Sequence, residues 1–415
     1  MSFEPQLQQH RHYMSIRVHN EDDIQKLYPL ILDYIREPNL ASSVKEFVFC
    51  CHLRWDDSYL IGADQSEGLG GEENARDISQ EHGILQVLTD LGLEEPVRSE
   101  WVRVLTWMKP ELIAAREETL GGNPFHENAR FYSYRDRLFA HYASALLLML
   151  CPNIEKIEYE EGSWIVDDML RRNNYGLLPK LHLEKLREVI LLPTTHFTLG
   201  DPRYYIYLDI LRMLQLFHRL PAIESVTTDG VGQNYNGGPL RRFPPATSNV
   251  KRIHVGHSMY GGDVIWSLIR APKLLEEITL TTGGHLTTDG GFSPVSAKTI
   301  GQALAIHKAS LRKVDIDLDR CLFETGYDEC DEEEEEEELE TEDEWLNRYH
   351  DAPFRLAEAL PKSLEYLTIR GYTRGSVVQY DSQIDELLLT REVRLPLLKE
   401  LHGINETIPS AAPIQ

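Results

Sequence analysis

The sequence predicts an α/β solenoid with parallel strands on a concave side, helices on the outer side, a helical insert and an acidic disordered loop. Two observations predict it: a six-residue pattern, apolar-x-x-apolar-x-apolar, recurs along the chain, and segments with helical spacing lie between its copies. A single such unit cannot bury its own apolar side, but stacked units bury a continuous core. The alternative is a doubly wound sheet. Two features disfavour a doubly wound sheet. Eight units of nearly equal length follow one another, and the first turn lacks the glycine-rich motif of dinucleotide-binding sheets.

The composition indicates a folded chain without affinity for polyanions. The 415 residues are 42% hydrophobic, which excludes wholesale disorder. They include 42 Lys and Arg against 67 Asp and Glu, so the formal charge is −25. Such a charge argues against binding to nucleic-acid phosphates or to anionic membranes. We therefore expect neither a nucleic-acid partner nor a membrane partner.

Cysteine usage and the first residues indicate the compartment. Residues 1–6 lack the basic and apolar regions of a secretory signal, and no apolar stretch reaches the length of a membrane span. The cysteines form an odd set without a C-x-x-C pair, namely Cys50, Cys51, Cys151, Cys321 and Cys330. Such a set suits reduced thiols. We expect a cytoplasmic or nuclear protein.

The first part of the chain predicts one unit of the array and then an interruption. Residues 14–55 have the pattern of strand, helix and strand, and the second strand holds an outlying copy of the repeat at 44–49. Residues 56–76 are polar and glycine-rich, which predicts a flexible loop. Helical segments follow within 77–150, where we expect a helical insert or a cap over the first repeats.

Residues 151–405 hold the repeats themselves. Copies of the pattern begin at Ile154, Leu186, Ile223, Val250, Leu275, Leu311, Leu364 and Leu398. Alternation at the second and third apolar positions predicts a short strand with one buried face, and the next helix must return the chain to start a parallel neighbour. Residues 203–219 and 295–307 are two of the segments in which helical spacing is expected.

One interval between copies is longer than the others because it contains an acidic run. Residues 324–344 hold 15 acidic side chains and no basic one. Such a run repels itself and buries nothing, so we expect a disordered insertion in a surface loop. The alternative is a binding strip for a basic partner such as a histone-like tail. Residues 406–415 are expected to form a tail.

The repeats resemble a known family at specific residues. Residues 310–316 (SLRKVDI) and 362–369 (KSLEYLTI) are similar to leucine-rich repeats. The length and degeneracy of the units over 153–404 resemble the repeat region of fungal F-box/leucine-rich-repeat proteins. This resemblance implies a non-catalytic scaffold that binds a protein on its concave strand face.

The turns depart from the family pattern. The family has Asn or Cys eight places after the first apolar residue of each unit, and this chain does not. Those places hold Gly162, Thr194, Val231, Ser258, Gly283, Asp319 and Tyr372. The asparagine ladder of the family is therefore missing, and we expect irregular turns.

The sequence is only weakly similar to an F-box. Residues 27–32 and 51–55 resemble its two ends, but the middle, 44–50, alternates like a strand where the family has a helix. The sequence therefore has no clear F-box. A substrate receptor of an SCF-type ubiquitin ligase, bound through a Skp-type adaptor, stays the alternative to a plain scaffold.

The candidate catalytic and metal motifs are weak, so we predict no enzyme, no cofactor and no metal. Asp315 and the two aspartates that alternate with it lack the glycine and glutamate of a calcium loop. His254 and His257 straddle a strand end, which argues against a shared zinc ion. The glycines within 230–238 lead into prolines and not into a helix, so we expect a turn and not a phosphate cradle.

Side chains that lie between the buried positions of each strand are predicted to face the partner. They mix both charge signs, which suits a protein partner better than a nucleic acid. The predicted partner-binding residues are Lys156, Glu158, Glu188, Arg252, His254, Glu277, Lys313, Asp315, Tyr366 and Arg370.

Overall fold

The computed structural model describes residues 14–50, 81–108, 134–193, 203–233, 243–285, 297–317, 355–374 and 378–404. These residues form a mixed α/β structure with a large parallel sheet of ten strands. The chain divides into two compact units, Met1–Asp201 with Arg212–Thr227 and Pro202–Leu211 with Thr228–Gln415.

The strands of the first unit pair in parallel in chain order. They are β1 (Ser15–Val18), β2 (Glu46–Phe49), β3 (Lys156–Glu160) and β4 (Glu188–Leu192). The strand β6 (Ser225–Asp229) begins in the first unit and ends in the second. Ile16, Phe47, Ile157 and Val189 occupy one register row and are all buried. The sheet of this unit therefore presents one continuous apolar row to the core.

Helices connect these strands and pack against one another. They are α2 (Glu21–Arg36), α3 (Pro38–Ser43), α6 (His82–Asp90), α7 (Val97–Leu105), the 3₁₀ turn η2 (Thr106–Met108), α9 (Tyr134–Leu150) and α10 (Trp164–Asn174). The central helix α9 contacts α2, α7 and α10. Two of the helices begin at side-chain caps: the Asn20 side chain accepts a hydrogen bond from the Asp23 N–H at 3.0 Å, and Ser163 Oγ accepts one from the Val166 N–H at 3.2 Å.

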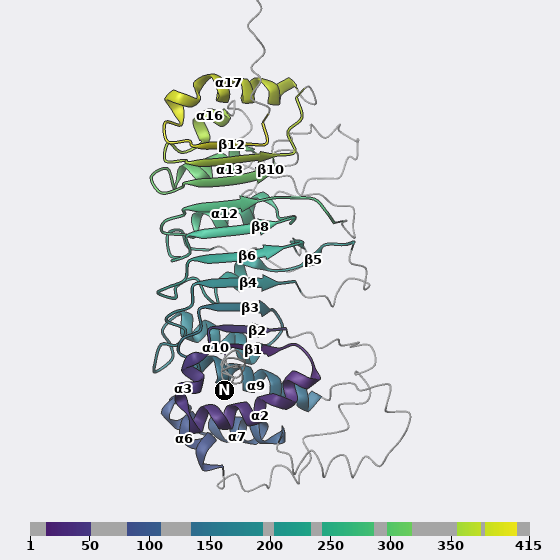
Figure 1. Cartoon of the computed structure of the whole chain (residues 1–415), viewed down its shortest axis with the longest axis vertical. Helices are drawn as coiled ribbons and strands as arrows, with labels where there is room; N and C mark the ends of the chain where they lie inside the picture. The colour runs from purple at the N-terminus through teal and green to yellow at the C-terminus, as the bar shows by residue number, and fades with distance from the viewer. Residues whose placement is uncertain are drawn as a thin grey trace, which may run out of the picture. The chain divides into compact units, whose positions relative to one another are not determined.

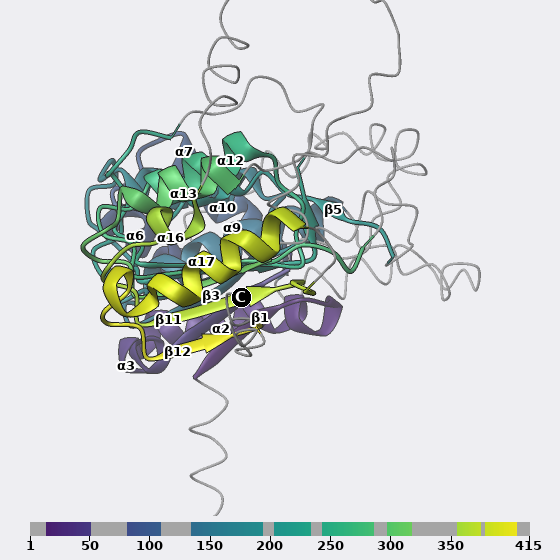
Figure 2. The same cartoon turned by 90° about the horizontal axis from the view of Figure 1, so that it is seen from above.

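The second unit repeats the same arrangement. Its strands are β8 (Arg252–Gly256), β9 (Glu277–Leu280), β10 (Lys313–Asp317), β11 (Tyr366–Arg370) and β12 (Glu400–His402), paired in parallel in this order (Figure 1). Its helices α12 (Gly262–Arg270), α13 (Ala297–Ala305), α16 (Leu356–Ala359) and α17 (Val378–Arg394) contact each other in sequence. Figure 2 shows these four helices on one side of β11 and β12.

One backbone contact recurs at the start of most strands of the large sheet. In each unit, the carbonyl oxygen of the second residue of a repeat accepts two successive N–H groups of the next repeat. The Lys251 oxygen accepts from Glu276 and Glu277, and the Glu276 oxygen in turn accepts from Arg312 and Lys313. The same contact recurs at the carbonyls of Lys45, Glu155, Arg187, Arg312 and Glu365. These backbone hydrogen bonds therefore recur once per sequence repeat.

The first apolar residue of each repeat fills the turn into its strand. All but the last of the starting residues are at most 1% exposed, namely Val44, Ile154, Leu186, Ile223, Val250, Leu275, Leu311 and Leu364. Side chains then alternate between buried and partly exposed along β4, β8 and β9. The prediction of short half-buried strands is confirmed for these elements.

The structure corrects one expected helix and leaves other predictions untested. Within 203–219 only α11 (Ile210–Leu214) is α-helical, while β5 (Ile206–Tyr207) pairs in parallel with β7 (Val231–Gly232). Helices do occupy the described part of 77–150. The predicted loop, acidic insertion and tail, at 56–76, 324–344 and 406–415, lie outside the described residues. Among the described helices, none has the length and apolar character that crossing a bilayer requires.

Candidate functional site

Two rows of side chains cross the strands of the second unit in register. The first row is Arg252, Glu277, Lys313, Tyr366 and Glu400, and the second is His254, Thr279, Asp315, Thr368 and His402. We call these ten residues the polar strand face. Side chains two residues apart along a strand share a face, so alternation places both rows opposite the buried positions that contact the helices.

The first row alternates in charge. Glu277 is flanked in register by Arg252 on β8 and by Lys313 on β10, and neighbouring strands lie about 4.8 Å apart. Lys313 Nζ is 3.9 Å from Glu277 Oε2, and the two side chains are 45% and 33% exposed. This long, solvent-exposed ion pair contributes little to stability. Both charges therefore stay accessible to another molecule.

Asp315 of the second row forms a tighter pair with Arg370, which lies on the neighbouring strand β11 outside the row. Arg370 donates from Nε to Asp315 Oδ1 and from Nη2 to Asp315 Oδ2, both at 2.7 Å. These hydrogen bonds raise the pKa of Arg370. Asp315 is only 9% exposed, whereas the Arg370 side chain is 53% exposed. The carboxylate therefore holds the guanidinium in place, and the guanidinium is the accessible member of the pair.

His254 lies in the same row and is uncharged at neutral pH. Its Nδ1 is 3.2 Å from Thr279 Oγ1 on the neighbouring strand. Burial lowers the pKa of His254 below the ordinary value for an imidazole. The centre of the polar strand face therefore carries polar, neutral groups between its charged positions.

The three predicted residues of the first unit form a separate cluster. Lys156 Nζ lies 2.7 Å from Glu158 Oε1 and 2.9 Å from Glu46 Oε1, and these two hydrogen bonds raise the pKa of Lys156. Glu188 pairs with Lys156 in the backbone register of β3 and β4. The structure thus brings Lys156, Glu158 and Glu188 together in one unit and the other seven predicted residues together in the other.

Sequence reasoning missed several members of the polar strand face. Thr279, Thr368, Glu400 and His402 occupy the same register rows as the predicted residues. Counting two residues along each strand from a buried position would have found them. Beside this face, Lys399 Nζ lies 5.7 Å from the centre of the Tyr366 ring, which suits a cation–π contact.

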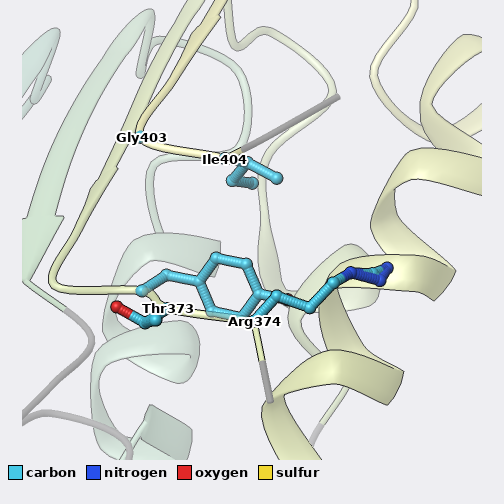
Figure 3. Close-up of a pocket in the computed structure, with 5 residues that line it drawn as sticks. Thr373, Arg374, Gly403 and Ile404 are labelled. Carbon is cyan, nitrogen blue, oxygen red and sulfur yellow. The ribbon is translucent and has the colours of Figure 1, made fainter. Parts of the chain in front are cut away.

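A shallow hollow opens where β11 and β12 end. It measures about 310 Å³ and is lined by Tyr372, Thr373, Arg374, Gly403 and Ile404 (Figure 3). Its polar groups already have partners, because Tyr372 Oη bonds Asp381 Oδ1 at 2.7 Å and Arg374 pairs with Asp385. Burial and this carboxylate raise the pKa of Tyr372 to about 12. The lining therefore offers neither an unpaired cation nor a reactive phenolate to a ligand.

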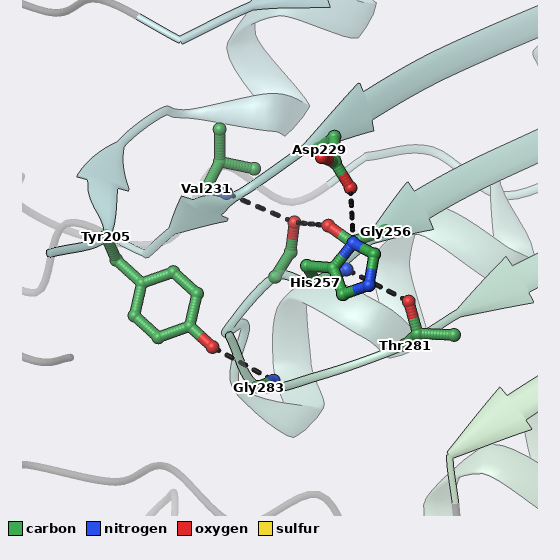
Figure 4. Close-up of polar contacts among 8 residues, drawn as sticks. Tyr205, Asp229, Val231, Gly256, His257, Thr281 and Gly283 are labelled. Atoms are coloured by element: carbon green, nitrogen blue, oxygen red, sulfur yellow. Dashed lines mark hydrogen bonds and ion pairs between the residues drawn. The ribbon is translucent and has the colours of Figure 1, made fainter. Parts of the chain in front are cut away.

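Hydroxyl groups support the turns after β6, β8 and β9, as Figure 4 shows. Ser258 Oγ accepts from the Val231 N–H at 3.2 Å and donates to the Gly256 carbonyl at 2.5 Å. Thr281 Oγ1 accepts from the His257 N–H at 2.9 Å. These hydrogen bonds stabilise turns of the kind that the asparagine ladder supports in leucine-rich repeats, a ladder that this sequence lacks.

The two histidines of the H-x-x-H motif have different partners. His257 has a φ of +42° and its Nδ1 is 2.9 Å from Asp229 Oδ1 (Figure 4), while His254 contacts Thr279. Within the described ranges, no group of three or more His, Cys, Asp or Glu side chains is arranged to hold a metal ion. Gly230, with a φ of +67°, lies between β6 and β7, whereas Gly232 belongs to β7 and the glycines at 237 and 238 lie outside the described residues.

The thiols that the structure describes are not activated. Cys50 and Cys151 are free. Burial, with the nearby carboxylates of Glu160 and Glu158, raises the pKa of Cys50 to about 12, and burial also raises the pKa of Cys151. Neither thiol forms a thiolate at neutral pH, which a nucleophile or a metal ligand requires.

Comparisons with known proteins give no relative from which a function could be transferred. No family model, no curated protein and no solved structure matches this chain.

Proposed function

We propose that this chain is a non-catalytic protein-binding scaffold of the leucine-rich-repeat type, and that it captures its partner on the polar strand face. One observation supports the proposal above all. Ten polar side chains lie in two register rows on five consecutive parallel strands, while the helices pack on the other side. A sheet face that no described element of its own unit covers is the surface that repeat proteins use for binding.

The chemistry of the polar strand face favours a folded or extended protein partner. Its first row carries cations at Arg252 and Lys313 and an anion at Glu277, and Tyr366 adds an aromatic surface. Alternating charges over a short distance select a partner with complementary charges and repel others. A phosphate backbone would instead need a surface of one sign.

A charge-reversal variant tests the proposal. Arg252→Glu with Lys313→Glu turns the first row acidic and should reduce recovery of the partner from the native cell at least about tenfold, since one opposed charge costs on the order of 1 kcal/mol or more. Recovery is measured by quantitative mass spectrometry of affinity-purified chain. The melting temperature should stay within a few degrees of that of the unmodified chain, because both side chains are partly exposed.

Lys308→Glu is the matched control, because Lys308 is exposed and lies outside the polar strand face. If the double variant and the control recover the same proteins in equal amounts, the polar strand face is not the binding site. Recovery of a Skp-type adaptor with the unmodified chain would instead favour the substrate receptor of an F-box-type ubiquitin ligase.

A further inference from the structure

We propose that β12 pairs with β12 of a second copy of this chain, so that two chains associate through the terminal strands of their sheets. Among the described residues β12 ends the strand order, and its neighbour β11 covers one of its two edges. An uncovered strand edge offers backbone N–H and C=O groups to another chain. This association rests on the open edge of β12 and not on the proposed function, although Glu400 and His402 also belong to the polar strand face.

The backbone of β12 determines which groups reach the open edge. The Glu400 N–H donates to the Glu365 carbonyl at 3.3 Å, so the Glu400 amide points inward toward the preceding repeat. Backbone groups alternate in direction along a strand, so the N–H and C=O of Leu401 point to the opposite edge. Two copies related by a two-fold axis can therefore form a hydrogen-bonded pair between Leu401 and Leu401 of the second copy.

The side chains of β12 are complementary under this two-fold axis. In an antiparallel pair centred on Leu401, all three residues of the strand find a partner, and Glu400 lies opposite His402 of the second copy. These flanking positions are non-hydrogen-bonded pairs, which bring side chains closest together. Within one chain His402 Nε2 lies 3.1 Å from Glu400 Oε2, but the Glu400 and His402 side chains are 56% and 63% exposed, so a second copy can reach both and exchange this contact for one between the copies.

The helix next to β12 also exposes apolar surface. Leu389 and Val393 on α17 are 74% and 78% exposed, and Leu397, just before β12, is 56% exposed. The last unit of a repeat array in a monomer usually carries a polar outer face. Exposed side chains of this size on the helix and in the turn that precede β12 favour a second copy as the cover, because pairing can remove apolar area from water.

Sedimentation velocity of the full chain over a wide concentration range tests the proposal. The unmodified chain should form a dimer. Glu400→Lys and His402→Glu should each weaken the association at least about tenfold, because the first removes the carboxylate that lies opposite His402 and the second places two carboxylates opposite one another. The double variant Glu400→Lys/His402→Glu places opposite charges across the pair and should recover most of the association. Lys308→Glu, an exposed reversal away from β12, should leave it unchanged.

Hydrogen exchange locates the contact in the unmodified chain, which keeps the test valid even if a variant folds poorly. Exchange in the peptide spanning 396–404 should slow as the dimer forms. A monomer at every concentration overturns the proposal, and so does dimerisation that neither single variant weakens. A double variant that folds but fails to recover excludes the antiparallel register. Protection of 396–404 at all concentrations would show that the chain covers its own edge.

Discussion

At the scale of single residues, Gly403 shows how the absence of a side chain permits a close backbone approach. Its φ is +80°, and a Cβ built at this position would lie 1.7 Å from the Ile369 carbonyl oxygen. The backbone after β12 must therefore shift to accept any other residue. Gly403→Ala should lower the free energy of unfolding by at least about 2 kcal/mol, measured by urea denaturation.

Gly283→Ala separates the steric cost from the cost of the conformation. Gly283 also has a positive φ, +88°, but no described atom would lie within 4 Å of a Cβ at this position. Its replacement should cost only about 1 kcal/mol, the penalty of a left-handed backbone for an L-residue. Equal losses in the two variants would show that the contact with Ile369 is not what requires glycine at 403.

The bidentate pair of Asp315 and Arg370 should be energetically coupled. A double-mutant cycle with Asp315→Asn and Arg370→Met should give a coupling of about 1 kcal/mol in urea denaturation, because the carboxylate is nearly buried while the solvent around Arg370 screens the pair. The same cycle on Glu277 and Lys313, whose charges are 3.9 Å apart and exposed, should give less than about 0.5 kcal/mol. Coupling of the same size in both pairs would contradict this ranking.

The burial of Asp315 also shows where sequence reasoning stops at this scale. Alternation along β10 correctly places Asp315 beside the other members of its row, but it also predicts an exposed acidic position. The carboxylate is instead covered by Arg370, which lies 55 residues later in the chain. No local pattern contains that contact, because it depends on the register between β10 and β11.

At the scale of elements, the strands of the repeats were predictable because their signal is local. A buried residue, two variable positions and an alternating pair specify a turn and a half-buried strand without knowledge of any neighbour. The candidate face followed from the same alternation. The division of the predicted residues between two units could not be predicted in this way. The sequence pattern is the same in both units, and the three-dimensional contacts that define each unit do not appear in it.

The elements that were missed depend on pairing between distant residues. β5 and β7 have two residues each, and they are strands only because Ile206 pairs with Val231 and Tyr207 with Gly232. Helical spacing over 203–219 identified apolar residues correctly, since Leu211 and Leu214 are buried, but it overestimated the length of the helix. Spacing reports which side chains are apolar and not which backbone groups are bonded.

At the scale of the whole molecule, buried and half-buried histidines should make the stability of the chain depend on pH. Burial lowers the pKa of His141 to about 4 and also lowers the pKa values of His182 and His307. In the unfolded chain these imidazoles titrate near 6.5. Between those values the unfolded state binds more protons, so the free energy of unfolding falls as the pH decreases from 7 to 5.

His141 alone should account for about 2 kcal/mol of this loss at pH 5. Urea denaturation at pH 7 and at pH 5 measures the change, and carboxylates contribute little in this window because most stay ionised. His141→Gln should reduce the dependence on pH. A free energy of unfolding that stays constant from pH 7 to pH 5 would contradict the prediction.

The recurring carbonyl contact at the start of a strand has a consequence for how such a chain can change its length. Lys313 pairs with Tyr366 in the same way as it pairs with Glu277, although many more residues separate it from Tyr366. The register between two neighbouring strands is thus set where the second strand begins. It does not depend on how many residues connect the two strands. Connections can therefore lengthen during evolution, or carry a grafted sequence, without disturbing the strands on either side.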